Sequence, residues 1–280
     1  MVTFIKINKR EANLLFEKAK DKARRNYESL AKKIGISRDM LFKYKRCAYP
    51  VPELILNQLI HFSNFNPKER TIIKKDKYLK KKIKKPFLNS NFAEILGVLN
   101  GDGHLSKVNS EVSVIGNLKE MEYFLYLKKK IEKLFKISFK IQKYPHYLKL
   151  RVYSSELIDF LNQKYGLPKG RKKGNLLIPK KILSKENLIA SYLKGLFDTD
   201  GSFYLRRKKD PVIEISSTDE RYLKQIRDVS LRIGILWNLK KKSVLIYRKD
   251  LIKKFWKLIG PANPKHLKKY NLYLNNAPVV

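Results

Sequence analysis

The order of hydrophobic and polar positions repeats itself in the second part of the chain. Each copy opens with an apolar run of helical character, which reads ILGVLNGDG from residue 95 and LKGLFDTDG from residue 193. Each run is followed by two segments with the alternating or continuous apolar residues of β-strands, an amphipathic helix, two further strands and a closing helix. The pattern predicts an α+β protein with two pseudo-symmetric α-β-β-α-β-β-α subdomains.

The expected elements occupy matching places in both copies. In the first copy we expect strands at 104–108, 111–115, 137–143 and 147–153, and helices at 119–135 and 155–165. In the second copy we expect strands at 202–206, 212–216, 235–240 and 244–247, and helices at 220–233 and 249–259. We therefore place the subdomains at 89–183 and 184–280, facing each other across a pseudo-twofold axis with the opening helices as the seam.

Each opening run closes on an aspartate, Asp102 or Asp200, that is directly followed by a glycine. We expect Gly103 and Gly201 to end the two helices in the left-handed conformation. A carboxylate on the last turn then lies against the partial negative charge of the helix C-terminus. A single acid of this kind is an ordinary Asp-Gly turn, whereas two at matched positions indicate a cation between them.

A glycine stands in the middle of each run, at Gly97 and Gly195. Glycine within a helix costs about 1 kcal/mol relative to alanine, so a close approach of two helix backbones is the expected compensation. Gly101 and Thr199 lie four residues further on, on the same helix faces. Packing of these faces would place the two motif acids side by side, unless the glycines only relieve crowding in an ordinary core.

The charge of the chain favours a polyanionic partner. Its 280 residues include 63 Lys and Arg against 25 Asp and Glu, a formal net charge of +38. Nucleic acid is the leading candidate for such a surplus, although surface lysine of a thermophile is an alternative source. Charge supplies affinity rather than sequence choice.

The strand at 147–153 predicts what each sheet face carries. Leu148, Leu150 and Val152 point to one face, towards the helices. Lysine, arginine and tyrosine occupy the other face, which suits phosphates and bases but is also typical of a solvated basic surface. The sheet residues that we expect to contact DNA are Lys149, Arg151, Arg206, Lys240 and Lys242.

Residues 27–46 carry a second pattern, with apolar positions at 30, 34, 36, 41 and 44. Ala31 is small where two helices would cross, Gly35 lies at the turn, and Ser37 can cap the next helix. The spacing resembles a helix-turn-helix, with 37–46 as the reading helix, or else a plain helical packing unit. The expected DNA-facing side chains are Arg38, Lys43, Lys45 and Arg46.

The N-terminal third therefore divides into a small all-helical domain at 1–66 and a lysine-rich linker at 67–88. The segment 74–85 is lysine-dense and Pro86 closes it. Such a run can follow a DNA backbone or serve as a solvated tether.

Several classes of protein are excluded or disfavoured. The single Cys47 rules out an intramolecular disulfide and a zinc site with several cysteines. The four histidines are too scattered for a metal-ligand spacing. We find no stretch of membrane-span length and no signal-peptide core, so we expect an intracellular, cytoplasmic protein that associates with the nucleoid when bound to DNA.

The paired motifs resemble those of the LAGLIDADG (DOD-type) homing endonucleases in their single-chain, two-motif form. The resemblance covers about residues 89–280 and includes the order of strands and helices. It implies a monomer whose two four-stranded sheets form a saddle over double-stranded DNA and whose activity is cleavage at long target sites. It also implies a divalent cofactor, normally Mg²⁺ or else Mn²⁺.

The resemblance assigns the metal to Asp102 and Asp200, with backbone near Gly101 and Thr199. Magnesium prefers oxygen ligands, often few carboxylates with phosphate and water. A basic residue after each closing helix completes the catalytic set in the family. We expect these residues to be Lys173 and Lys265, with Lys172 as the alternative to the first.

One position departs from the motif symmetry, because Asn100 stands where the second motif has Asp198. This position is expected to support the helix end rather than to hold metal. Weakened activity of one half is the alternative outcome.

Three functions remain open on this scaffold. The first is a site-specific DNA endonuclease, the second a non-cleaving DNA-binding transcription regulator, and the third an intron maturase that assists RNA folding. Inteins also belong to the family, but the expected self-splicing ends are absent, so a free-standing enzyme fits better.

Overall fold

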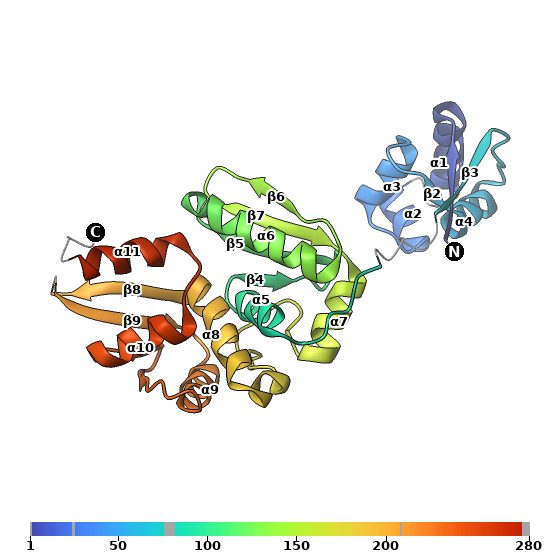
Figure 1. Cartoon of the computed structure of the whole chain (residues 1–280). Helices are drawn as coiled ribbons and strands as arrows, with labels where there is room; N and C mark the ends of the chain where they lie inside the picture. Colours follow the sequence, from blue (N-terminus) through green and yellow to red (C-terminus); the bar gives the residue numbers. More distant parts are fainter. Residues whose placement is uncertain (1, 24–25, 76–81, 208, 276–280) are drawn as a thin grey trace. The chain divides into compact units, whose positions relative to one another are not determined.

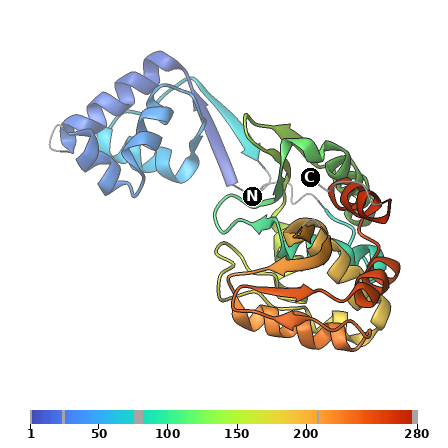
Figure 2. The ribbon, with the colours of Figure 1, turned by 90° about the vertical axis from the view of Figure 1, so that its left-hand side faces the viewer.

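The computed structural model describes residues 2–23, 26–75, 82–207 and 209–275. The chain forms two compact units, Met1–Leu79 and Lys80–Val280, and each has its own hydrophobic core (Figures 1 and 2). In the part of the chain that is described, no helix has the length and apolar character needed to span a membrane.

The N-terminal unit is a mixed α/β structure, so the prediction of an all-helical domain is wrong. Its strands β1 (Val2–Ile7), β2 (Val51–Pro52) and β3 (Arg70–Lys75) form an antiparallel sheet in the order β2-β1-β3. Strand β3 falls within the segment expected to be a linker. The backbone of β3 pairs with β1 along the full length of that strand. This pairing stabilises β3 as a strand, although its lysines obscure the alternation of polar and apolar residues that would have predicted one. Residues 76–81 of the same segment lie outside the described residues.

Helices α1 (Lys9–Lys22), α2 (Tyr27–Lys33), α3 (Arg38–Lys45) and α4 (Glu53–Ser63) complete this unit. The turn between α2 and α3 lies where the sequence predicts it, with Gly35 at a φ of +72°. Ser37 caps α3, because its side chain accepts a hydrogen bond from Met40 N. Leu30 and Leu41 are fully buried, so the apolar pattern of residues 27–46 builds the core of the unit.

The C-terminal unit contains the predicted duplication. Its first half consists of α5 (Ser90–Asn100), β4 (Gly103–Leu105), β5 (Glu111–Gly116), η1 (Leu118–Glu120), α6 (Met121–Phe135), β6 (Lys140–Lys143), β7 (Leu148–Tyr153) and α7 (Ser155–Tyr165). After the short η2 (Lys180–Ser184), the second half consists of α8 (Glu186–Asp200), β8 (Gly201–Arg206), β9 (Asp210–Ser216), α9 (Glu220–Leu231), β10 (Asn238–Leu239), β11 (Ser243–Ile246) and α10 (Lys249–Ile259). The α-β-β-α-β-β-α order of both halves is confirmed.

Each half folds into one antiparallel four-stranded sheet covered on one face by helices. The strand order is β4-β5-β7-β6 in the first sheet and β10-β11-β9-β8 in the second. Taken from its other edge, the second order is β8-β9-β11-β10, so the two sheets are equivalent. Helices α6 and α7 pack on the first sheet, and α9 and α10 pack on the second (Figure 1). Strand β7 alternates as predicted, because Leu148, Leu150 and Val152 are buried while Lys149 and Arg151 are only half-buried.

Helices α5 and α8 pack against each other and form the seam between the halves (Figure 1). A Cβ atom added at Gly97 would lie closer than 3.0 Å to Tyr192 O. A Cβ atom added at Gly195 would lie equally close to Glu94 O. Both mid-helix glycines therefore stand at a direct contact of two helix backbones.

A further helix, α11 (Pro264–Leu274), follows the second half and was not predicted. Asn263 caps it by accepting a hydrogen bond from Lys265 N, and Pro264 opens it. Tyr270 stacks on Trp256, with ring centroids 4.0 Å apart. His266 is buried, 2% exposed, against the ring of Phe197.

Acidification should lower the free energy of unfolding of the C-terminal unit, because His266 is buried and does not take up a proton in the folded state. Burial is the main cause that lowers the pKa of His266 to about 3, and the charge of Lys265 lowers it further. An unfolded histidine has a pKa of about 6.5. Below that pH only the unfolded state takes up the proton, so stability is lost as the pH falls from about 6.5 towards 3.

Urea unfolding followed by tryptophan fluorescence measures this effect, since Trp237 and Trp256 both lie in the second half. The contribution of His266 should be a loss of about 1 kcal/mol per pH unit. A His266→Phe variant should lack that contribution. Identical pH dependence of the variant and the unchanged protein would contradict the prediction.

Candidate active site at the helix seam

The motif acids come together where α5 and α8 end. Helix α8 ends at Asp200, and α5 ends at Asn100 with Gly101 as its cap. A Cβ atom added at Gly101 would lie 3.4 Å from Asp200 Cγ and would overlap the side chain of Thr199. Asp102 follows directly, so the close packing of the helix ends places both carboxylates at one junction.

The glycines after the acids act differently from the prediction. Gly201 has a φ of −88°, and neither Gly103 nor Gly201 is among the residues with positive φ, so the left-handed helix end is wrong. A Cβ atom on Gly103 would lie 2.5 Å from Leu99 O, and one on Gly201 would lie 2.7 Å from Phe197 Cγ. Glycine is needed here because each strand leaves its helix in close contact with the preceding turn.

The two carboxylates lie in a field that disfavours their negative charge. The pKa of Asp200 is raised to about 7, first by burial and then by the charge of Asp102, against the opposing effect of Lys172 and Lys265. Burial also raises the pKa of Asp102. Asp102 retains an exposed surface while Asp200 is half-buried, so the pair is accessible to a ligand. A cation at this junction would relieve the repulsion between the two acids.

Lys172, the alternative candidate, is the lysine that approaches the acids in the first half. Its Nζ donates a hydrogen bond of 3.1 Å to Asn100 O and another to Gly101 O. Burial lowers its pKa to about 8, and the charges of Asp200 and Asp102 oppose that shift. Lys173 is exposed, and within the described residues its side chain forms no ion pair. In the second half Lys265 lies within the electrostatic range of both acids.

Asn100 and Asp198 fix the chain that returns after each closing helix. Asn100 Nδ2 donates to Leu177 O at 3.0 Å and to Tyr192 Oη at 2.6 Å. Asp198 instead accepts hydrogen bonds from Ala262 N and Asn263 N, all at 3.0 Å. The Asn100 amide donates to a backbone carbonyl, whereas the Asp198 carboxylate accepts from backbone N–H groups. The two motifs therefore differ at this position because one partner is an acceptor and the other partners are donors.

Exchanging these two side chains should destabilise the protein. In Asn100→Asp a buried carboxylate would face Leu177 O, at a cost of about 2–4 kcal/mol. Asp198→Asn would turn an N–H donor towards backbone donors, at a cost of about 1–3 kcal/mol. Chemical unfolding should show both losses, while Asn91→Asp, on the exposed face of α5, should change little. Equal stability of Asn100→Asp and Asn91→Asp would contradict the assignment.

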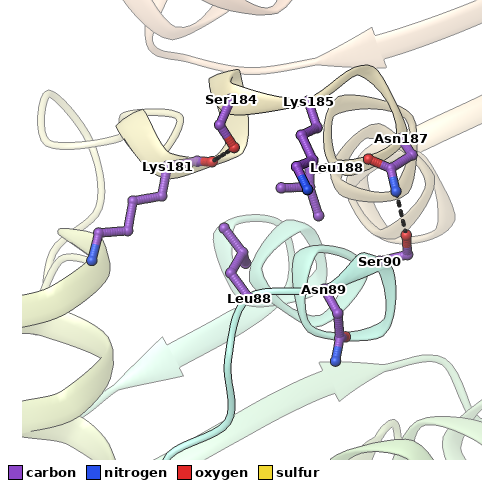
Figure 3. A pocket seen from close by; sticks show the side chains of 8 residues that line it. All are labelled: Leu88, Asn89, Ser90, Lys181, Ser184, Lys185, Asn187 and Leu188. Atoms are coloured by element: carbon purple, nitrogen blue, oxygen red, sulfur yellow. Dashed lines mark hydrogen bonds between the residues drawn. The ribbon is translucent and has the colours of Figure 1, made fainter.

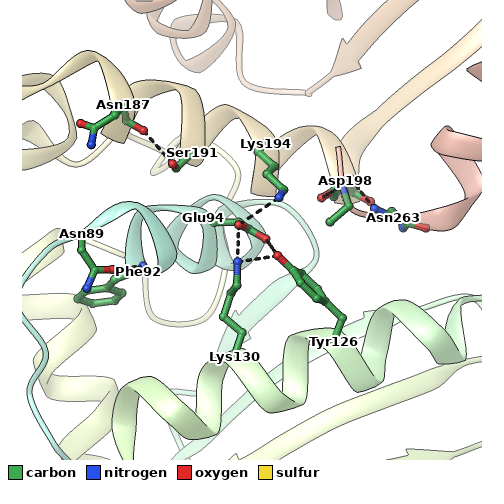
Figure 4. A network of polar contacts seen from close by, with 11 residues as sticks. Asn89, Phe92, Glu94, Tyr126, Lys130, Asn187, Ser191, Lys194, Asp198 and Asn263 are labelled. Atoms are coloured by element: carbon green, nitrogen blue, oxygen red, sulfur yellow. Dashed lines mark hydrogen bonds and ion pairs between the residues drawn. The ribbon is translucent and has the colours of Figure 1, made fainter. Parts of the chain in front are cut away.

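A buried glutamate, which no sequence pattern predicted, joins the helices of the seam. Glu94 is 3% exposed. Its carboxylate accepts hydrogen bonds from Tyr126 Oη and Lys130 Nζ, both at 2.6 Å, and pairs with Lys194 Nζ at 3.6 Å (Figure 4). The sequence feature that could have predicted it is a single acid, Glu94, within an otherwise apolar helical run. The network links α5, α6 and α8 and so holds the seam in register.

A cavity of about 470 Å³ lies at the other end of the seam (Figure 3). Leu88, Asn89 and Ser90 line it from the start of α5, and Asn187 and Leu188 line it from the start of α8. The motif acids lie at the opposite ends of these helices, so this cavity is separate from the candidate active site.

The predicted DNA contacts of the sheets differ in their surroundings. Lys149 Nζ and Arg151 Nη1 pair with Glu111 at 2.6 and 3.5 Å, so part of their charge is compensated. Arg206 lies over the ring of Tyr247, 5.3 Å from its centroid. Lys240 and Lys242 are exposed.

On α3 only part of the predicted set is available to a ligand. Lys45 turns towards α1, where its Nζ lies 2.5 Å from Glu17 Oε1, so the prediction that it faces DNA is wrong. Lys43 Nζ pairs with Asp39 at 2.5 Å. Arg38 and Arg46 are exposed, and within the described residues their guanidinium groups form no ion pair. Both guanidinium groups lie over the ring of Phe42.

One domain family and several solved structures are similar to this chain. Residues 187–260 match the LAGLIDADG-like domain family. The homing endonuclease I-WcaI bound to its DNA recognition sequence has a TM-score of 0.51 and 15% identity, covering 71% of this chain and 94% of that chain. The N-terminal LAGLIDADG domain of DUF199/WhiA has a TM-score of 0.43 and 19% identity, covering 64% of this chain and 85% of that chain.

Two proteins of Methanocaldococcus jannaschii share part of the sequence. A replication factor C small subunit is 29% identical over 192 residues, or 65% of this chain. A glutamine–fructose-6-phosphate aminotransferase is 31% identical over 198 residues, also 65% of this chain. This chain spans only 10% and 17% of the length of these two relatives.

Proposed function

We propose that this chain, which carries a LAGLIDADG-like domain in the homing endonuclease fold, is a site-specific endonuclease that hydrolyses double-stranded DNA with a divalent metal. The observation that carries the proposal is the junction of Asp102 and Asp200 between two lysines. Burial raises the pKa of both acids, and a bound cation would favour their ionised forms.

The donor set fits a hard divalent cation. Asp102 and Asp200 supply carboxylate oxygens, and carbonyls near Gly101 and Thr199 are further candidates. Mg²⁺ keeps water and phosphate among its ligands, so two carboxylates are a sufficient contribution from the protein. When bound, Mg²⁺ or Mn²⁺ would lower the pKa of a water molecule and offset charge on the phosphate.

The lysines supply the remaining chemistry. The ammonium groups of Lys172 and Lys265 lie beside the acids and would stabilise the negative charge that builds up on the phosphate. The low pKa of Lys172, about 8, also makes it a proton carrier near neutral pH. The two lysines place one basic group in each half, as two strand cleavages require.

The open sheet faces of the C-terminal unit would hold the DNA. In the N-terminal unit, the exposed Arg38 on α3 and Arg46 at its cap would add contacts. The net charge of +38 predicts binding that weakens with salt, by a log–log slope of about 0.9 per phosphate neutralised. The relative I-WcaI is bound to its DNA recognition sequence, which supports DNA as the partner.

Cleavage selection tests the proposal. The purified protein is incubated with a library of randomised duplexes in Mg²⁺, and cut molecules are recovered and sequenced. We expect one target family, cut on both strands, and no product when EDTA removes the metal. Tight binding of one duplex without cleavage in Mg²⁺ or Mn²⁺ would instead support a transcription regulator. Preference for a structured intron RNA would support a maturase.

A further inference from the structure

Glu120 connects the two halves beside the candidate active site. It ends η1 in the first half and is nearly buried, with 11% of its side chain exposed. Its Oε2 accepts a hydrogen bond of 2.7 Å from Asn117 N. Its Oε1 accepts from Asn263 Nδ2 at 2.8 Å and lies 2.9 Å from Lys265 Nζ. One carboxylate of the first half therefore holds two side chains of the second half.

Asn263, the second partner of Glu120, is itself held by the end of α8. Asn263 Nδ2 also donates to Asp198 O at 3.0 Å, and Asn263 N donates to the Asp198 carboxylate (Figure 4). Asp198 belongs to the last turn of α8, two residues before Asp200. Glu120, Asn263 and Asp198 thus form a continuous chain of hydrogen bonds from the first half to the end of the seam.

Lys172 is held in another way. Its ammonium group binds the carbonyls of Asn100 and Gly101 at the end of α5. Glu120 precedes α6, and the residue that precedes α9 in the second half is Asp219. Asp219 accepts a hydrogen bond from Tyr222 N, and among the described residues no ion pair joins it to Lys172. Different groups therefore position the two lysines: backbone carbonyls hold Lys172, and the Glu120 carboxylate holds Lys265.

We propose that Glu120 is a positioning residue for Lys265, and that the cleavage of one DNA strand depends on Glu120 while the cleavage of the other strand does not. The inference rests on the proposed nuclease function. An ammonium group held at 2.9 Å by an ionised carboxylate is oriented before DNA binds. Loss of that partner leaves a flexible lysine in a site where a displacement of about 1 Å costs up to about 100-fold in rate.

Strand-resolved cleavage tests the inference. The substrate is a supercoiled plasmid that carries the duplex recovered by cleavage selection, and primer extension reports the rate on each strand. Glu120→Gln should slow one strand about 10- to 100-fold and accumulate nicked circles. Lys265→Ala should slow the same strand, Lys172→Ala the opposite strand, and the double variant E120Q/K265A no more than Lys265→Ala alone.

Glu122→Gln is the matched control, because Glu122 is an exposed glutamate on α6 two residues away. It should cut both strands at the rate of the unchanged protein. Thermal unfolding of all variants provides a readout without DNA. The effects of Glu120→Gln and Lys265→Ala on stability should be non-additive, as expected for two groups in contact.

Two failures are distinguishable. If the unchanged protein cuts both strands but Glu120→Gln slows both equally, or slows the strand that Lys172→Ala affects, the positioning role of Glu120 is wrong and the nuclease function stands. If the unchanged protein cuts no duplex with Mg²⁺ or Mn²⁺, the nuclease function is wrong and this inference falls with it.

Discussion

Replacing either motif acid, by Asp102→Asn or by Asp200→Asn, should reduce the rate of DNA cleavage by about 1,000-fold or more. The amide keeps the shape of the side chain but removes the negative charge that attracts the metal. DNA affinity should remain or increase, because one charge that repels phosphate is lost. Cleavage of the selected duplex and filter binding in EDTA measure the two quantities separately.

The same variants should be at least as stable as the unchanged protein. Burial and mutual repulsion raise the pKa of Asp200 to about 7, so its ionised form destabilises the fold at neutral pH. A neutral asparagine relieves that cost. Asp250→Asn is the control for loss of an acid, since Asp250 is exposed and pairs only with Arg248 within the described residues. Normal cutting by both motif variants would show that the metal is held elsewhere.

Replacing a seam glycine by alanine, which adds one methyl group, should strongly lower the stability of the fold. Gly97→Ala and Gly195→Ala each place a Cβ atom within 3.0 Å of a backbone oxygen of the facing helix. The helix backbones have to separate, at a cost of about 2–4 kcal/mol. Alanine regains about 1 kcal/mol in helix propensity, which does not offset the overlap.

Separation of α5 and α8 also moves Asp102 away from Asp200, so both glycine variants should lose cleavage at temperatures where they remain folded. Ser191→Ala is the control on α8, because among the residues that the structure describes its hydroxyl bonds only to Asn187 O and no atom is added. Thermal unfolding and cleavage rates should both leave Ser191→Ala near the unchanged protein. Unaltered stability of Gly195→Ala would contradict this prediction, because the helices would then accommodate the added Cβ atom without separating.

The features predicted best from sequence are those that repeat. The two motif runs, the strands at matching places and the alternation of β7 each depend on local periodicity, which the sequence displays directly. The close approach of the two helix backbones at Gly97 and Gly195 was predicted because mid-helix glycine is costly and requires a reason. The meeting of Asp102 and Asp200 follows from that contact.

What the sequence did not predict depends on partners far away along the chain. The strand β3 exists because it pairs with β1, although its own residues look like a charged tether. Asn100 and Asp198 differ because one faces a carbonyl and the other faces N–H groups, and neither partner is within 60 residues. Lys172 and Lys173 are adjacent in a basic run, so only the fold of the loop decides which ammonium group reaches α5.

The decisive measurement is an anomalous difference map from a crystal of the protein with its selected DNA and Mn²⁺. We expect a Mn²⁺ peak at the junction of the Asp102 and Asp200 carboxylates, close to a DNA phosphate. A map in which Mn²⁺ binds elsewhere, or in which the two carboxylates point away from every metal, would contradict it.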